Sequence, residues 1–124
     1  MIAMHRCLRL LTTVAVALAC SSATAPSGTV AAVAGAAGIT ATNGTSRTIF
    51  YAAVEREASA LYDFYACTDA SRCDHIAPGA RATLPWSRVA SFDPAKREYL
   101  FYWWQAPPAD DTQPRSGSIL VLRR

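Results

Sequence analysis

The chain has 124 residues, of which 17% are charged, so it is long enough for one small domain and too short for several. Its formal charge of +3 includes Arg6 and Arg9 of the N-terminal segment, and without them ten basic side chains face nine acidic ones. Lys96 is the single lysine and no stripe of basic residues is present, so the charge gives no reason to expect a nucleic-acid partner.

The first nineteen residues have the three parts of an export signal. Arg6 and Arg9 give a basic start, residues 10–19 form an uncharged apolar run, and small residues precede Cys20. The run is shorter than the roughly 20 apolar residues that a membrane-spanning helix needs. We therefore expect residues 1–19 to be a signal peptide, and the protein to be exported to the periplasm, the outer membrane or the extracellular medium.

The residues before Cys20 indicate how the exported protein is held. Ala17-Leu18-Ala19-Cys20 resembles the lipobox of bacterial lipoproteins, although that class usually has Leu at the position of Ala17. The resemblance implies lipidation of Cys20, which would be the first mature residue and the only link to a membrane. Ala17 and Ala19 also fit the rule for an ordinary secretory signal cleaved at the same bond, so both a lipoprotein and a freely secreted protein remain open.

Residues 20–38 consist almost entirely of Ala, Ser, Thr, Gly and Val, and they carry no charge. Such a segment has no clear period and few large side chains to bury, so it predicts a flexible spacer. The alternative is a first strand around residues 29–33.

From residue 39 to residue 124, short runs of β-branched and aromatic residues alternate with turn residues, a pattern typical of strands. The segment from 98 to 105 is the strongest, and we expect it to be central and buried. Turns are expected at Asn43-Gly44 and Pro78-Gly79. The expected strands cover residues 39–42, 47–55, 60–67, 81–84, 98–105 and 118–122.

These strands predict one all-β domain, a small Ig-like β-sandwich of about six to seven strands. The alternative is an α+β fold with a helix near residues 52–66. Val54, Ala58, Leu61 and Tyr65 fall at helical spacing there. The aromatic residues of this segment favour strands.

Two of the four cysteines lie in the globular part. Cys7 is lost with the signal and Cys20 lies at the lipidation site, which leaves Cys67 and Cys73 in an oxidising compartment. We predict a disulfide between them, which chain-entropy arithmetic values at about 2–2.5 kcal/mol. Two thiolates and His75 could instead hold a soft metal, but the motif lacks a fourth ligand, and we expect neither metal nor cofactor.

Aromatic residues cluster in the second half of the chain. On a strand, Trp103 and Trp104 point to opposite faces, so one can fill the core while the other faces outward or lies under the loop of residues 106–116. An outward Trp beside Tyr102 or Trp86 could stack on a sugar or anchor a protein partner. The candidate ligand-binding residues are therefore Trp86, Tyr102, Trp103 and Trp104.

The sequence carries no recognisable catalytic motif. His75 is the only histidine that remains after cleavage, and no G-x-S-x-G elbow is present. We therefore expect no enzyme but a cell-envelope protein that binds another protein or a surface component such as a glycan. The alternatives are a carbohydrate-binding module that uses exposed Trp and Tyr, and a small hydrolase or metal-binding protein centred on His75.

Overall fold

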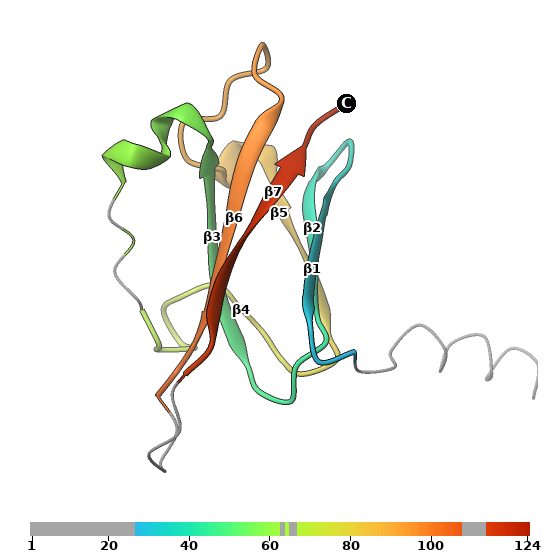
Figure 1. Cartoon of the computed structure of the whole chain (residues 1–124), viewed down its shortest axis with the longest axis vertical. Coiled ribbons are helices and arrows are strands. Elements are labelled where there is room, and N and C mark those ends of the chain that lie inside the picture. Colours follow the sequence, from blue (N-terminus) through green and yellow to red (C-terminus); the bar gives the residue numbers. More distant parts are fainter. Residues whose placement is uncertain (1–26, 63, 65–66, 108–113) are drawn as a thin grey trace, which may run out of the picture.

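The structure, a computed structural model, describes residues 27–62, 64, 67–107 and 114–124 (Figure 1). The expected signal peptide and Cys20 lie outside the described residues. The described part contains seven strands: β1 (Val30–Ala34), β2 (Gly38–Asn43), β3 (Ile49–Glu55), β4 (His75–Ile76), β5 (Arg81–Pro85), β6 (Glu98–Gln105) and β7 (Ser116–Leu122).

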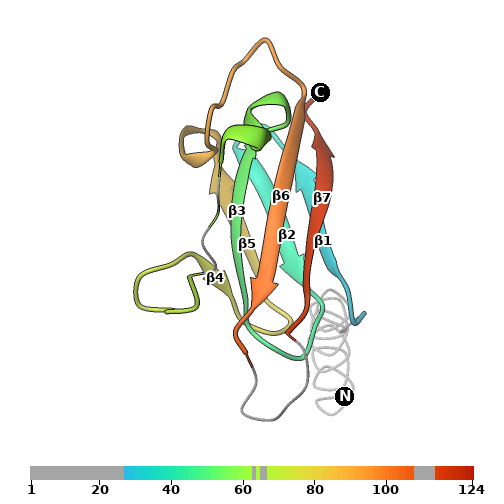
Figure 2. The ribbon, with the colours of Figure 1, turned by 60° about the vertical axis from the view of Figure 1, so that its left-hand side comes forward.

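The strands form two antiparallel sheets that face each other (Figures 1 and 2). Sheet A has the order β1-β2-β5, and sheet B has the order β4-β3-β6-β7. This arrangement confirms the predicted all-β sandwich of six to seven strands. No helix within the described part of the chain is long and apolar enough to cross a membrane.

The core lies between the sheets, and β6 shows how the sequence produces it. Along β6 every second side chain is buried, and the intervening ones are partly exposed on the outer face of sheet B. β6 lies between β3 and β7, so its predicted central position is confirmed. The buried apolar residues that form the core are Ile39, Ala41, Ile49, Ala53, Ile76, Leu84, Val89, Tyr99, Phe101, Trp103 and Val121.

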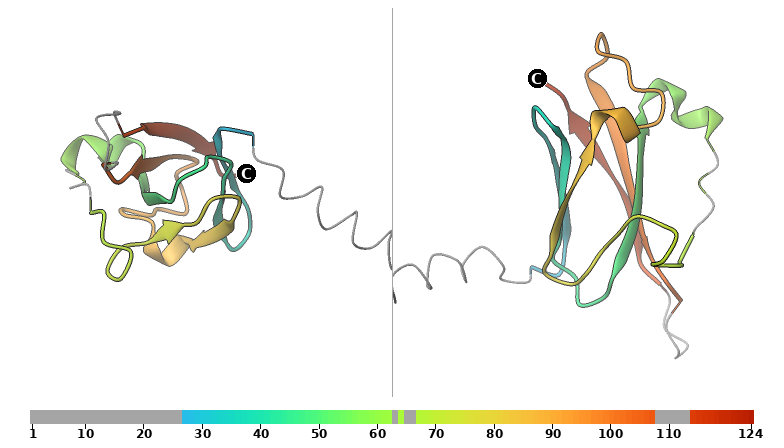
Figure 3. Two further views of the ribbon diagram at one scale, coloured as in Figure 1. Left: turned by 90° about the horizontal axis from the view of Figure 1, so that it is seen from below. Right: turned by 180° about the vertical axis from the view of Figure 1, so that it is seen from behind.

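The chain crosses between the sheets three times, after β2, β4 and β5, and forms hairpins at β1–β2 and β6–β7 (Figure 3). The crossing after β4 uses the predicted turn at Pro78-Gly79, where Gly79 has φ +73°. The crossing after β5 includes the short 3₁₀ helix η2 (Trp86–Arg88). Near the start of β6, the Tyr99 hydroxyl donates to the Asp93 carbonyl at 2.6 Å and so fixes the loop that precedes the strand.

Two expectations about the first half of the chain need correction. Part of the expected spacer is ordered, because β1 pairs with β2 from Val30↔Asn43 to Ala34↔Ile39, as the alternative of a first strand requires. The expected turn at Asn43-Gly44 is displaced, because Gly44 continues the pairing with β1 and the chain bends at residues 45–47. The buried Asn43 side chain fixes this bend by donating to the Arg47 and Ile76 carbonyls.

The expected strand at residues 60–67 is wrong over its described residues, and so is the alternative of a helix near 52–66. β3 continues to Glu55, whose carboxylate accepts the N–H groups of Glu57 and Ala58. These bonds start a 3₁₀ helix, η1 (Glu57–Leu61), that is too short to replace a strand. The two-residue strand β4 was not predicted from the sequence. It pairs with β3 and forms the edge of sheet B.

Candidate ligand-binding groove

The outer face of sheet B carries partly exposed aromatic side chains. Tyr102 and Trp104 point outward from β6, and their register partners on β7 are Ser118 and Ser116. On the other side, Tyr102 pairs with Ala52 of β3, whose methyl group covers little of the ring. Short neighbours on both sides therefore leave the Tyr102 ring accessible.

A segment outside the sheet forms one wall of this surface. We call residues 57–62, 64 and 67 the strap; it consists of η1 and the described residues that follow it (Figures 1 and 3). Its Phe64 ring lies 5.3 Å from the Tyr102 ring, and Tyr62 lies 5.7 Å from Phe64. The Tyr62 hydroxyl is 2.9 Å from the Ser91 Oγ, so the strap is tied to the loop before β6.

The far end of the strap is fixed at two points. Cys67 and Cys73 form the predicted disulfide, with Cα atoms 6.3 Å apart. Trp104 donates its indole Nε1–H to the Cys67 carbonyl at 2.9 Å. The disulfide therefore holds the strap beside the sheet, and the strap in turn orients the Trp104 ring.

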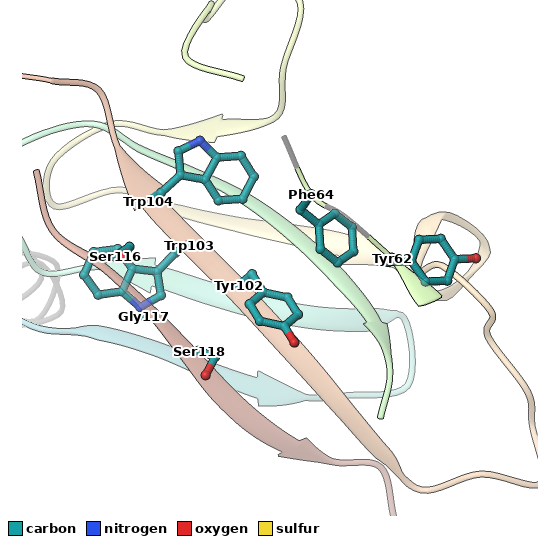
Figure 4. Close-up of a pocket in the computed structure, with 8 residues that line it drawn as sticks. All are labelled: Tyr62, Phe64, Tyr102, Trp103, Trp104, Ser116, Gly117 and Ser118. Atoms are coloured by element: carbon teal, nitrogen blue, oxygen red, sulfur yellow. The ribbon is translucent and has the colours of Figure 1, made fainter. Parts of the chain in front are cut away.

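Between the strap and β7 lies a groove of about 460 Å³. Figure 4 shows the rings of Tyr102 and Trp104 on β6, with the rings of Phe64 and Tyr62 from the strap beside Tyr102. The planes of Tyr62 and Phe64 differ by only 12°, and those of Phe64 and Tyr102 differ by 41°. The lining residues are Tyr62, Phe64, Tyr102, Trp103, Trp104, Ser116, Gly117 and Ser118.

Trp103 belongs to the core but reaches the edge of this groove. Its ring lies against Gly117 on β7, where a Cβ atom would come within 2.8 Å of the indole nitrogen. The absence of a side chain at Gly117 therefore leaves room for the Trp103 ring. Trp103 is only 8% exposed.

Three of the four candidate residues thus come together, because Tyr102, Trp103 and Trp104 all line the groove. Trp86 does not join them. It packs against Phe92 and Tyr99 at ring distances of 5.3 and 5.1 Å and donates its indole N–H to the Gly35 carbonyl at 3.0 Å. Trp86 therefore belongs to the corner between β5 and β6, away from the groove.

Sequence reasoning missed the contribution of the strap and of β7. Tyr62 and Phe64 were assigned to a strand, although their spacing of two already placed them on one face. Pro107, Pro114 and Arg115 of the loop of residues 106–116 line a hollow together with Trp104, and Cys67 makes the hydrogen bond to its indole. Residues 108–113 of that loop lie outside the described residues.

His75 is exposed at the start of β4, beside the disulfide. Its Nδ1 lies 3.0 Å from the Cys73 carbonyl, and both nearby cysteines are bonded to each other. The adjacent Asp74 is paired with Arg88, whose pKa is raised by that hydrogen bond. Within the described ranges, no group of three His, Cys, Asp or Glu side chains could hold a metal ion.

The arrangement is suited to binding through ring faces and hydroxyl groups. A scan against protein-family models and searches of curated proteins and solved structures found no match to this chain. The properties of the groove are therefore the basis for a functional proposal.

Proposed function

We propose that this protein is a non-catalytic binding domain of the cell envelope and that the groove on the outer face of sheet B is its ligand site. The observation that carries the proposal is the set of four aromatic side chains at the groove that are at least partly exposed, Tyr62, Phe64, Tyr102 and Trp104. Exposed aromatic side chains are costly to leave in water, and they contribute strongly to recognition where they occur together.

The location in the envelope rests on the export signal and Cys20. A single disulfide suits this location, since a small domain outside the cytosol gains stability from such a crosslink. The proposed location therefore rests on the first twenty residues, whereas the proposed binding site is formed by residues between positions 62 and 118.

A retention experiment tests the proposal. The exported chain is immobilised and incubated with solubilised cell envelope, and the retained material is compared among variants. We expect Tyr102→Ala and Tyr62→Ser to lose most of the retained component, because each removes part of the aromatic surface. Val33→Ser, which changes a residue that is 63% exposed on β1 of the other sheet, is the matched control and should retain it fully.

Circular dichroism melting of each variant checks that the fold is intact. Equal retention by all variants would show that the groove is not the ligand site.

A further inference from the structure

The lack of charged side chains in the described lining of the groove indicates which class of ligand it can bind. None of the described lining residues is charged. The guanidinium of Arg115, next to the groove, donates to the Gly28 carbonyl at 3.1 Å and lies 5.8 Å from the Trp103 ring centre, so it is already engaged. Polyanions such as nucleic acids bind along surfaces that supply Lys and Arg. The groove therefore favours an uncharged ligand.

The arrangement of the rings points in the same direction. Tyr62, Phe64, Tyr102 and Trp104 present a broad surface of ring faces (Figure 4). The anchoring side chain of a protein partner is best held in a deep, fully desolvated pocket. A broad, open surface of several ring faces is better matched by a ligand that itself presents a series of apolar faces.

Hydroxyl groups border this aromatic surface. Ser116 and Ser118 are exposed along β7, and Ser118 is the register partner of Tyr102, whose side chain carries a further hydroxyl group. Hydroxyl groups both donate and accept hydrogen bonds. The serine and tyrosine hydroxyls can therefore donate hydrogen bonds to the hydroxyl groups of a ligand or accept hydrogen bonds from them.

We infer that the groove binds a neutral carbohydrate chain, with sugar rings on the faces of Tyr102 and its aromatic neighbours and sugar hydroxyls on Ser116 and Ser118. A pyranose ring has an apolar C–H face for the aromatic rings and a rim of hydroxyl groups for the serines. This inference rests on the proposed function, because it names the ligand class of the same groove.

Affinity electrophoresis tests the inference with defined probes. The exported chain is run in native gels that contain hydroxyethyl cellulose, laminarin, yeast mannan or galactomannan, with alginate as the acidic comparison. We expect retardation by at least one neutral polysaccharide and none by alginate. Binding to the retarding polysaccharide, measured by tryptophan fluorescence, should be unchanged between 50 and 500 mM NaCl, because no ion pair is involved.

The variants locate the site. Tyr102→Ala should weaken binding roughly tenfold or more, the range expected for losing a stacked ring and its buried area. Ser118→Ala should weaken it about threefold, as for one hydrogen bond. Val33→Ser should bind as the parent does.

The outcomes separate this inference from the proposed function. If no neutral polysaccharide binds but envelope material is still retained in a Tyr102-dependent way, the ligand is of another class and only the carbohydrate inference fails. If a polysaccharide binds equally well to Tyr102→Ala, the groove is not the carbohydrate site. If neither experiment gives Tyr102-dependent binding, both proposals fail.

Discussion

At the scale of single residues, Gly117 determines how close β7 comes to the largest core side chain. A Cβ atom at this position would lie 2.8 Å from the Trp103 indole nitrogen and 3.0 Å from the adjacent ring carbon. Because Trp103 is buried, its ring has little room to retreat. We expect Gly117→Ala to lower the free energy of unfolding by about 1–3 kcal/mol, as overpacked core sites do.

Gly35→Ala is the matched control, since its Cβ atom would meet only the Gly38 carbonyl oxygen, at 3.8 Å. Urea unfolding followed by tryptophan fluorescence measures both variants. Gly35→Ala should change stability by less than about 0.5 kcal/mol, as surface substitutions usually do. Equal effects of the two substitutions would contradict the role given to Gly117.

Glu55 makes stability depend on pH. It is only 6% exposed, and its pKa is lowered mainly by the hydrogen bond from the Glu57 N–H, with a further bond from Ala58. A carboxyl group whose folded pKa lies below its ordinary value of 4.5 stabilises the fold above that value. This contribution is lost as the pH falls through the lowered folded pKa.

We therefore expect Glu55→Gln to be less stable than the parent at pH 7 and the difference to shrink as the pH falls to 3. The midpoint of urea unfolding, measured for both proteins at each pH, gives the comparison. The other carboxyl groups titrate in both proteins, so the difference between the two unfolding midpoints reports the titration of Glu55 alone. A gap that stays constant from pH 7 to pH 3 would count against this role.

At the scale of secondary-structure elements, the strap depends on the disulfide for its position. The bond between Cys67 and Cys73 closes a short loop, which is worth about 2–2.5 kcal/mol in the chain-entropy picture. We expect Cys67→Ser with Cys73→Ser to lose about this much stability. The strap should also loosen, because its link to the Trp104 indole passes through the Cys67 carbonyl.

Hydrogen exchange measured by mass spectrometry separates the two effects. Exchange should rise most in the strap, while β6 and β7 keep their protection relative to the new global stability. Uniform loss of protection throughout the domain would mean that the disulfide supports the whole sandwich rather than the strap.

The edge strand β7 exposes apolar side chains in its second half, after the residues 116–118 that line the groove. β7 pairs only with β6, and Leu120 and Leu122 are 48% and 58% exposed. A long edge strand without charges favours pairing with other chains. We expect Leu120→Lys to raise the concentration at which light scattering detects aggregates, with little change in the unfolding midpoint. An unchanged aggregation threshold would indicate that another surface controls association.

The elements differ in how well the sequence predicts them, for physical reasons. β6 alternates between a buried and a partly exposed face over its whole length, so its bounds of 98–105 could be read directly. β1 contains only Ala and Val and has little burial signal of its own, so it is visible mainly through its pairing with β2. In the strap, Tyr62 and Phe64 have the spacing of two that is typical of a strand. The described residues there belong to no strand, and Phe64 packs against Tyr102 on the face of sheet B.

The candidate site was predictable only in part, because residue type and spacing do not give tertiary neighbours. The alternation on β6 correctly predicted that Trp103 and Trp104 face opposite ways, but only the structure shows that Trp103 is the one in the core. Trp86 has the same residue type, yet the corner before β6 encloses it against Phe92 and Tyr99. Tyr62, which is over thirty residues from β6, enters the groove only because the disulfide and Ser91 hold the strap there.

At the scale of the whole molecule, the start of the described chain and the groove belong to different sheets. The described chain enters sheet A through β1, whereas the groove lies on the outer face of sheet B (Figures 1 and 2). The ten residues from Cys20 to β1 span at most about 36 Å when fully extended. If Cys20 is lipidated as we propose, this length limits how far the domain can lie from the membrane.

Processing at Cys20 is the prediction that tests this arrangement. We expect intact-mass measurement of the protein, expressed in a bacterium with lipoprotein-processing enzymes, to show loss of residues 1–19, because Ala17 and Ala19 precede a short apolar run. If Cys20 is acylated, the mass includes the lipid and the protein partitions into the detergent phase of a Triton X-114 separation. Cys20→Ser should still lose residues 1–19 by ordinary signal cleavage, yet it should remain in the aqueous phase. A full-length chain in the envelope would contradict cleavage, and identical aqueous partitioning of both proteins would favour free secretion over lipidation.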